Sequence, residues 1–174
     1  NIDDTIILTK TVAHFYRYIG NYNVDLETGF VPFVDTANVL PDSVDSISIF
    51  ESVLPADVAQ FTADMRAKGG VYSNFTITGR DSNNTVVAYY PYTISFVRTL
   101  IAPFKTSENT LGYDASSSTT RSQAIKNSFT TMDVACSGRS TATFTQAASV
   151  TVYAPILQNG IPTAVSSSVL LLKQ

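Results

Sequence analysis

Aromatic and hydroxyl side chains alternate in the middle of the chain, a pattern typical of a small-molecule pocket. Tyr92, Ile94 and Phe96 fall on one face of a predicted strand, because successive strand residues point to opposite sides. Ligand sites are lined mainly by apolar and aromatic groups, with a few polar groups that fix orientation. The aromatic residues in or near the predicted sheet are Tyr90, Tyr92, Phe96, Phe104, Tyr113, Phe144 and Tyr153, and the interleaved hydroxyls include Ser137 and Thr151. These side chains line either a pocket or an ordinary core.

Catalytic chemistry has little support in the sequence. The chain has one cysteine, Cys136, and one histidine, His14, and it has neither a glycine-rich phosphate loop nor a His-Glu-x-x-His or Gly-x-Ser-x-Gly signature. Two such residues are too few for a His/Cys metal site, and we interpret Cys136 as a buried neutral thiol. Asp114 lies just before a serine run, where a carboxylate caps a helix. We therefore expect no enzyme activity, no metal and no cofactor.

The composition limits the partners of the chain. Its 174 residues carry a net charge of −3, and its 11 lysine and arginine residues are scattered rather than clustered. This distribution lacks the basic patch that nucleic-acid binding requires. No apolar run reaches the roughly 18 residues that span a bilayer, and we expect no signal peptide in this sequence. The length suits one domain, with or without a helical extension.

The first 30 residues predict a helix with an apolar seam. The seam residues are spaced alternately by four and three positions, as in a coiled coil, and they are Leu8, Val12, Phe15, Ile19, Tyr22 and Leu26. Two interpretations remain open. The segment is either a stalk that pairs with a second copy of the chain or an amphipathic helix that lies against its own domain.

The remaining sequence predicts a mixed order of strands and helices. Strands are expected at 46–50, 71–79 and 86–101, the last two as an antiparallel pair, and further strands at 141–146 and 149–157. Helices are expected at 57–68, ended by Gly69 and Gly70, and at 114–131 with Ala124, Ile125 and Phe129 turned inward. The last segment, 164–172, is either a strand or the start of a helix. This order predicts an α+β fold in which helices flank an antiparallel sheet.

Five separate pieces of the sequence, in this order, resemble the CHASE domain. A strand over 44–53 leads into a helix and two glycines; Tyr90-Pro91-Tyr92 and Pro103 follow. Next come the turn Leu111-Gly112-Tyr113-Asp114, Arg121 in the helix after it, and a strand that ends in Ala154-Pro155-Ile156. The CHASE domain is the sensory ectodomain of receptor histidine kinases and nucleotide cyclases, and the resemblance covers about residues 40–160.

The resemblance implies a fold and a function. It implies a PAS-like sheet, with residues 1–36 as an N-terminal stalk helix and residues 37–174 as the sensory domain. The chain would be an extracellular or periplasmic ectodomain, tethered to the plasma membrane in the full-length receptor, that binds a small molecule. The receptor would pair as a homodimer through the N-terminal helix and signal through it. The alternative is a protein-interaction or adhesion module without a small-molecule pocket.

The resemblance also implies positions for ligand contacts. In the plant cytokinin receptors of this family, an acid before the Leu-Gly-Tyr-Asp-like turn and a threonine after the helix contact an adenine-type ligand. The corresponding positions here are Phe104 or Lys105 and Ser137, so the hydroxyl is kept and the acid is absent. A charged Lys105 accepts no hydrogen bond and would favour an anionic ligand. The candidate ligand-binding residues are Tyr92, Ile94, Phe96, Phe104, Lys105, Tyr113, Ser137 and Thr151.

Overall fold

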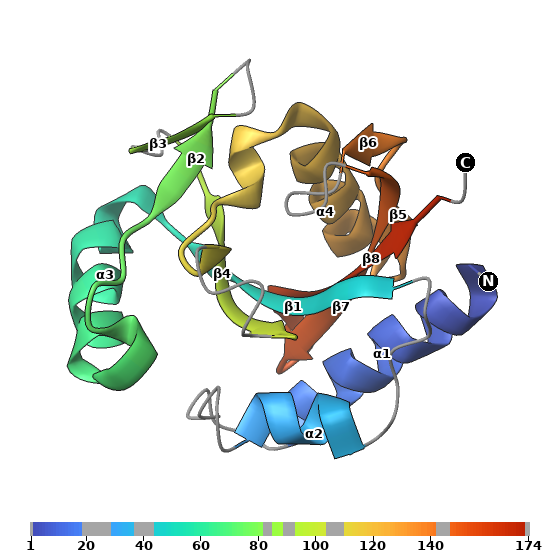
Figure 1. Ribbon diagram of the computed structural model, residues 1–174, viewed down its shortest axis with the longest axis horizontal. Coiled ribbons are helices and arrows are strands. Elements are labelled where there is room, and N and C mark those ends of the chain that lie inside the picture. Colours follow the sequence, from blue (N-terminus) through green and yellow to red (C-terminus); the bar gives the residue numbers. More distant parts are fainter. Residues whose placement is uncertain are drawn as a thin grey trace.

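The computed structural model describes residues 2–18, 29–36, 44–81, 85–88, 93–103, 110–141 and 147–172. Within them, a twisted antiparallel sheet separates helices that lie on its two sides (Figure 1). The chain order is helix α1 (Ile2–Tyr18), α2 (Val31–Thr36), strand β1 (Val44–Val53), α3 (Val58–Ala67), β2 (Thr78–Arg80), β3 (Val86–Ala88), β4 (Ser95–Ala102), α4 (Thr119–Thr131), β5 (Ala135–Cys136), β6 (Ser140–Thr141), β7 (Ala148–Gln158) and β8 (Ile161–Leu171). The predicted α+β class, with a PAS-like sheet flanked by helices, is confirmed.

The main sheet has the strand order β4-β1-β8-β7-β5, and β6 also pairs with β7. Each of these pairs is antiparallel. The long strands β7 and β8 form a hairpin whose turn contains Asn159 and Gly160, with φ angles of 52° and 80°. An Asn-Gly turn fits the twist of two paired strands, so it fixes their register. The segment 164–172, left open between strand and helix, therefore belongs largely to β8.

Helix α1 lies against the sheet of its own domain. The seam residues Leu8 and Val12 are buried in a core that also contains Ile47 and Ile49 of β1, and Phe15 stacks on Phe33 with ring centroids 3.6 Å apart. The structure thus shows the second of the two interpretations for the described part of the seam. Ile19, Tyr22 and Leu26 lie outside the described residues. The domain boundary after residue 36 and the pairing with a second copy stay predictions.

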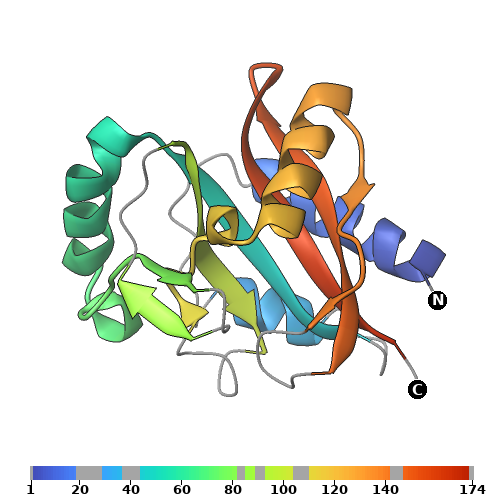
Figure 2. The same cartoon turned by 90° about the horizontal axis from the view of Figure 1, so that it is seen from above.

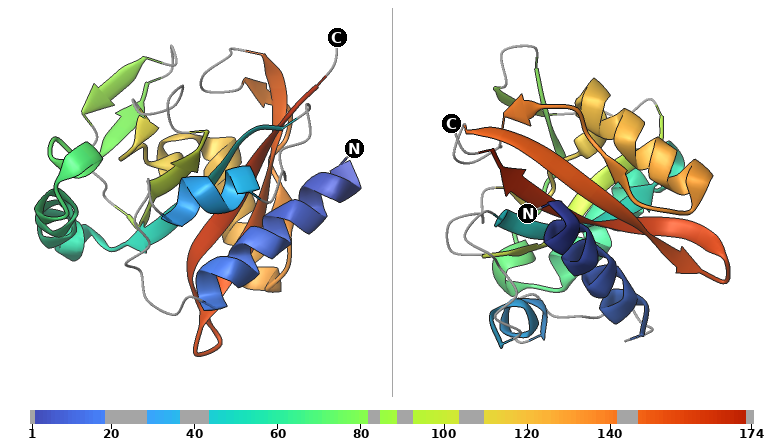
Figure 3. Two further views of the ribbon diagram at one scale, coloured as in Figure 1. Left: turned by 60° about the horizontal axis from the view of Figure 1, so that its bottom comes forward. Right: turned by 90° about the vertical axis from the view of Figure 1, so that its right-hand side faces the viewer.

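Two cores occupy the two sides of the sheet. The larger core holds α1, α2 and the segment from α3 to Ile77, and the smaller core lies between the sheet and α4. Figures 2 and 3 show α4 and α1 on opposite sides of the β7–β8 hairpin. We call the two sides the α1 face and the α4 face. The predicted helix at 114–131 is confirmed as a 3₁₀ turn, Ala115–Ser117, followed by α4, with Ala124 and Ile125 buried.

The strand predicted at 71–79 is wrong over most of its length. After α3, Gly69 and Gly70 take positive φ angles of 71° and 55° and start a 3₁₀ turn over Gly70–Tyr72. Tyr72 then points inward, where its hydroxyl donates to the carbonyl of Thr99 at 2.7 Å. Only Thr78–Arg80 pairs with a strand, β3. The predicted antiparallel pairing of the segments 71–79 and 86–101 is therefore correct, but it covers only three pairs of residues.

The long strand predicted at 86–101 divides into β3 and β4. The intervening Tyr89, Tyr90, Pro91 and Tyr92 lie outside the described residues.

Cys136, interpreted above as buried, is exposed, because β5 is a two-residue strand at the edge of the sheet. Partial burial still raises the pKa of its thiol, so the side chain is uncharged at neutral pH.

Candidate functional site

The turn Leu111–Asp114 runs beside the edge strand β4 and fixes the position of Tyr113. The backbone N–H of Arg98 donates to the carbonyl of Tyr113, and the N–H of Gly112 donates to the carbonyl of Arg98, both at 2.9 Å. Gly112 has a φ of 80°, and a Cβ on it would overlap the carbonyl oxygen of Thr76. Glycine is therefore required here, because the neighbouring backbone approaches too closely for any side chain.

Asp114 closes this turn and anchors the start of the following helix. Its carboxylate is fully buried and accepts hydrogen bonds from the N–H of Phe96 at 2.9 Å, the N–H of Ser116 at 2.8 Å and the hydroxyl of Ser116 at 2.7 Å. The predicted capping role is confirmed. The same carboxylate also ties the helix start to β4, so Asp114 holds both elements that carry the site.

Two buried arginines meet two tyrosines and a phenylalanine on the α4 face. Arg98 of β4 and Arg121 of α4 are 3% and 7% exposed. The Arg98 guanidinium lies 4.9 Å from the ring centroid of Phe50 and 5.5 Å from that of Tyr113. Arg121 donates from Nη1 to the Tyr113 hydroxyl at 2.9 Å. Tyr153 packs edge-on against Phe50. We call these five residues the arginine–tyrosine cluster.

Both arginines of the cluster are charged although they are buried. Burial lowers the pKa of Arg98 to about 10, and the positive charges of Arg121 and Arg80 act in the same direction. Burial also lowers the pKa of Arg121, but Tyr113 and Tyr153 raise it by more, so Arg121 keeps its charge firmly. Burial raises the pKa of Tyr153 to about 12. At neutral pH Arg98 and Arg121 are therefore charged and the Tyr153 phenol is neutral.

Buried hydroxyls without hydrogen-bond partners extend the site along the same face. Ser48 of β1 pairs in register with Ser167 of β8, and Ser167 pairs with Tyr153 of β7, so these three side chains form a row. The hydroxyl oxygens of Ser46, Ser48 and Ser167 are buried and have no partner in the structure. Buried polar groups are nearly always paired, so each exception requires an explanation.

The predicted site residues are only partly brought together. Phe96 and Tyr113 are buried in the core beneath α4, with Tyr113 in the cluster itself. Ser137 and Thr151 pair at the other end of the sheet, where the Ser137 hydroxyl accepts from the N–H of Thr151 at 2.9 Å. Ile94 precedes β4 and is 43% exposed. Tyr92, Phe104 and Lys105 lie outside the described residues, and their proposed ligand contacts stay predictions.

Several members of the site were not among the predicted ligand contacts. They are Ser48, Phe50, Arg98, Arg121, Tyr153 and Ser167. One signal was available for Arg98, because it interrupts the apolar run from Phe96 to Ile101. A charged residue in such a run is almost never fully buried unless it has a partner or a function.

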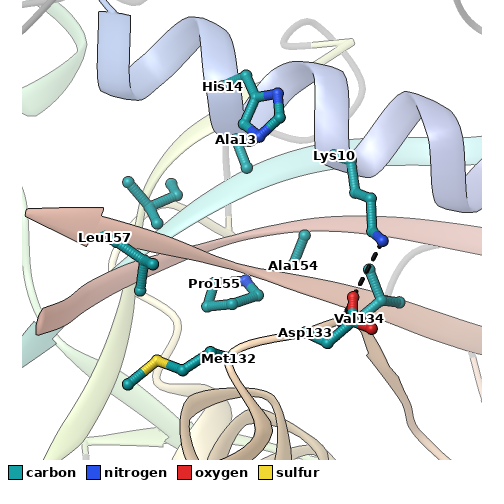
Figure 4. Close-up of a pocket in the computed structure, with 10 residues that line it drawn as sticks. Lys10, Ala13, His14, Met132, Asp133, Val134, Ala154, Pro155 and Leu157 are labelled. Atoms are coloured by element: carbon teal, nitrogen blue, oxygen red, sulfur yellow. Dashed lines mark hydrogen bonds and ion pairs between the residues drawn. The ribbon is translucent and has the colours of Figure 1, made fainter. Parts of the chain in front are cut away.

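A shallow pocket of about 250 Å³ lies at the surface between α1, β7 and the end of α4. In Figure 4, Lys10 and His14 reach down from α1, and Met132 and Asp133 approach from the loop after α4. Lys10 Nζ and Asp133 Oδ1 form an ion pair at 2.9 Å. Both side chains are well exposed, so the pair contributes at most about 1 kcal/mol. The ion pair nevertheless connects the loop after α4 to helix α1, which lies on the other side of the sheet.

Among the residues that the structure describes, no group of three histidine, cysteine or carboxylate residues is placed to hold a metal ion. No helix among the same residues is long and apolar enough to cross a membrane.

Comparison with known proteins assigns the family. A model of the CHASE domain matches residues 25–169, which is most of the chain. The chain therefore belongs to the CHASE domain family, whose members are sensory domains of receptor kinases and cyclases. The resemblance drawn from the sequence is confirmed. A search of the curated proteins found no match.

Proposed function

We propose that this chain is the extracellular ligand-binding domain of a transmembrane receptor, either a histidine kinase or a nucleotide cyclase. The observation that carries the proposal is the arginine–tyrosine cluster, which buries charge and aromatic surface against a row of hydroxyls without partners. Membership of a sensory family supports the receptor context. The ligand binds on the α4 face, where these groups converge. The chain itself catalyses no reaction.

The structure offers a route from this site to α1. Arg121 of the cluster lies on α4, and α4 ends at Met132, next to the Asp133 that pairs with Lys10 of α1. A ligand that draws Arg121 toward the sheet would move α4 and shift its contact with α1. Such a change biases the output only if the ligand binds one arrangement more tightly than the other. The start of α1 and the end of β8 lie on the same side of the molecule, which suits attachment to one membrane (Figure 2).

The receptor is proposed to act as a homodimer through the N-terminal helix. The inner seam of α1 is occupied by its own sheet, so pairing would use the outer surface, where Ile7 is 65% exposed. Ile7→Ser should therefore reduce pairing in solution, and Thr11→Ser, another substitution on the exposed surface of the helix, serves as the control.

Native mass spectrometry of the purified domain tests the proposed function. We expect a bound small molecule that is released on denaturation, and a dimer at micromolar concentration. A chain that binds no small molecule from its native source or from a metabolite extract would contradict the sensor function.

One observation favours the alternative, a protein-interaction module. Strand β3 exposes two consecutive apolar residues, Val86 at 51% and Val87 at 37%, on a two-stranded sheet separate from the main one (Figure 2). If the double substitution Val86→Ser and Val87→Ser abolished receptor signalling while small-molecule binding was absent, the interaction module would replace the sensor.

A further inference from the structure

We propose that the pocket between α1, β7 and the loop after α4 is a second ligand site, which binds a small zwitterion with an apolar side chain, such as a free aliphatic amino acid. The pocket has a volume of about 250 Å³. Sites for drug-sized ligands measure about 300–1,000 Å³, so the occupant here is smaller. The inference goes beyond the proposed function, because this site is separate from the α4 face and does not depend on a ligand there.

The pocket lies where the sheet stops along one edge of β7. Among the described residues, β5 pairs with β7 only as far as Tyr153. The backbone of Thr151 faces this edge, because its carbonyl accepts from the N–H of Ser137 at 2.8 Å. The backbone of Pro155, four residues further, faces the same edge, but proline has no N–H to donate to another strand. The edge is therefore a poor pairing surface for a strand of another protein, which favours a small molecule as the occupant.

Much of the pocket lining is apolar. Ala13 of α1 and Ala154 and Ile156 of β7 are buried members of the core under α1. Val134 is partly buried and packs against the same core. Met132 also lines the pocket, is 48% exposed, and takes a φ of 55° at the end of α4. Its flexible thioether side chain can adapt to the shape of a bound group. These surfaces favour a ligand with an aliphatic side chain.

The charged side chains of the pocket are a lysine and a carboxylate. Lys10 and Asp133 form the ion pair at 2.9 Å, and His14 lies one turn along α1 from Lys10 (Figure 4). The side chains of Lys10 and Asp133 are 48% and 66% exposed, so their pair is weak and can open. An α-amino acid carries a carboxylate and an ammonium group on one carbon atom, and it can therefore pair with both residues at once. A ligand with a single charge would pair with only one of them.

A ligand in this pocket would act on the connection between α4 and α1. In the free protein, the Lys10–Asp133 pair joins the loop after α4 to α1 directly. A zwitterion between the two side chains would replace this contact with one that runs through the ligand. The free and bound states would then hold α4 and α1 differently, and the ligand would favour the arrangement that it binds more tightly.

Isothermal titration and thermal unfolding of the purified chain with four probes test this inference. L-Leucine should bind with a Kd of about 1 mM or below, and about 10 mM should raise the melting temperature by about 2 °C or more. 4-Methylpentanoate lacks the ammonium group of leucine, leucinamide lacks its carboxylate, and glycine lacks its side chain. Each should bind at least about fivefold more weakly than leucine. Equal affinity of any of the three would overturn the inference, and so would a failure of leucine to bind.

Variants locate the binding. Lys10→Met and Asp133→Asn should each weaken leucine binding by about fivefold or more. Lys126→Met changes another exposed lysine, on α4 and outside the pocket, and should leave the affinity unchanged. Met132→Gly should also weaken binding, while the melting temperature of the free protein stays close to that of the wild type, because glycine readily takes a φ of 55°. Unchanged affinity in all three pocket variants would overturn the inference.

Methyl NMR with leucine separates this inference from the proposed function. The signals of Val134 and Leu157, which line the pocket, should shift, and those of Ile125 and Val165 on the α4 face should stay in place. Shifts confined to Ile125 and Val165 would overturn the second site and support ligand binding on the α4 face. No shift at any of the four would overturn the second site alone, because the α4 face has a test of its own.

Discussion

Three consecutive serines of β8 show how the two faces of the sheet differ. Ser166 and Ser168 point to the α1 face, where Ser166 donates to the carbonyl of Thr9 at 2.6 Å and Ser168 hydrogen-bonds the Thr9 hydroxyl at 2.8 Å. That hydroxyl also donates to the carbonyl of Thr5 at 2.6 Å. Ser167, between them, points to the α4 face and has no partner. All three serines are at most 1% exposed.

The difference separates a structural face from the proposed binding face. On the α1 face, helix α1 supplies partners for the hydroxyls of Ser166 and Ser168, and most of the surrounding side chains form an apolar core. On the α4 face, the hydroxyls of Ser48 and Ser167 are buried without a hydrogen-bond partner. Unsatisfied polar groups destabilise a fold, and natural proteins keep them where function requires them. The same strands thus stabilise the domain on one side and carry the proposed site on the other.

The largest expected effect comes from the turn that builds the α4 face. Gly112→Ala should cost more than about 3 kcal/mol of unfolding free energy, because its Cβ would meet the Thr76 backbone at a positive φ. Gly160→Ala is the matched control: it has the same φ of 80° but open space around it, so it should cost about 1 kcal/mol. Equal losses in urea unfolding would show that the close approach to Thr76 does not matter.

Asp114→Ala should be next in size, at about 2 to 4 kcal/mol. The change removes three hydrogen bonds and leaves the buried N–H of Phe96 without its acceptor. The same urea unfolding assay measures the loss. Asp57→Ala at the start of α3 is the control, because that exposed carboxylate makes no side-chain cap and should cost less than about 1 kcal/mol. Similar losses for the two variants would remove the special role of Asp114.

The serines of β8 divide the faces most sharply. Ser168→Ala should destabilise the free protein by about 1 kcal/mol, because it removes the hydrogen bond to Thr9. Ser167→Ala should leave stability unchanged or raise it slightly, since it removes a buried hydroxyl that has no partner. Thermal unfolding without ligand measures both. If Ser167→Ala destabilised the free protein as much as Ser168→Ala did, the contrast between the faces would fail.

The smallest expected effect concerns Glu51, a charged group on the α1 face. Its carboxylate accepts a hydrogen bond from Tyr16 at 3.4 Å, but burial raises its pKa. The pKa of Glu51 is thus higher in the folded than in the unfolded protein. The neutral carboxyl contributes its full stability below the unfolded pKa of 4.5, and this contribution is lost as the pH rises through the folded pKa. Glu51→Gln should therefore be more stable than the wild type at neutral pH, by less than about 1 kcal/mol.

The pH dependence provides the check on Glu51. The difference between the two proteins should vanish below about pH 4, where both side chains are neutral. Urea unfolding at pH 7 and at about pH 3.5 gives the comparison. If the wild type were more stable than Glu51→Gln at pH 7, the prediction would be wrong. The neighbouring groups on the α1 face would then stabilise the ionised carboxylate of Glu51.

The sequence predicted the parts of the fold that local patterns determine. A glycine marks the turn over 111–114, and a capping residue marks the start of the helix that follows it. Alternating polar and apolar residues mark the strands β1 and β7. The strand predicted at 71–79 was wrong because Gly69 and Gly70 do more than end a helix: they also reverse the chain into a 3₁₀ turn. The hairpin of β8 had a usable signal in Asn159-Gly160, a common two-residue turn.

The site was less predictable because it depends on which face each side chain occupies. The pairing of β1 with β4 shifts register between Ile49 and Phe50, which places Arg98 opposite Phe50. No local pattern reveals that shift. The row from Ser48 to Tyr153 joins three strands that are far apart in the sequence. Its missing partners become visible only when the whole sheet is assembled.

Methyl NMR of the purified chain with and without a small-molecule ligand obtained from a metabolite extract tests the division between the faces most directly. Val165 and Ile125 lie in the core under α4, whereas Ile47 and Ile49 lie in the core under α1, and all four side chains are fully buried. We expect the methyl signals of Val165 and Ile125 to shift on binding while those of Ile47 and Ile49 stay in place. Shifts confined to Ile47 and Ile49, or no shift at any of the four, would contradict the assignment of the α4 face as the ligand site.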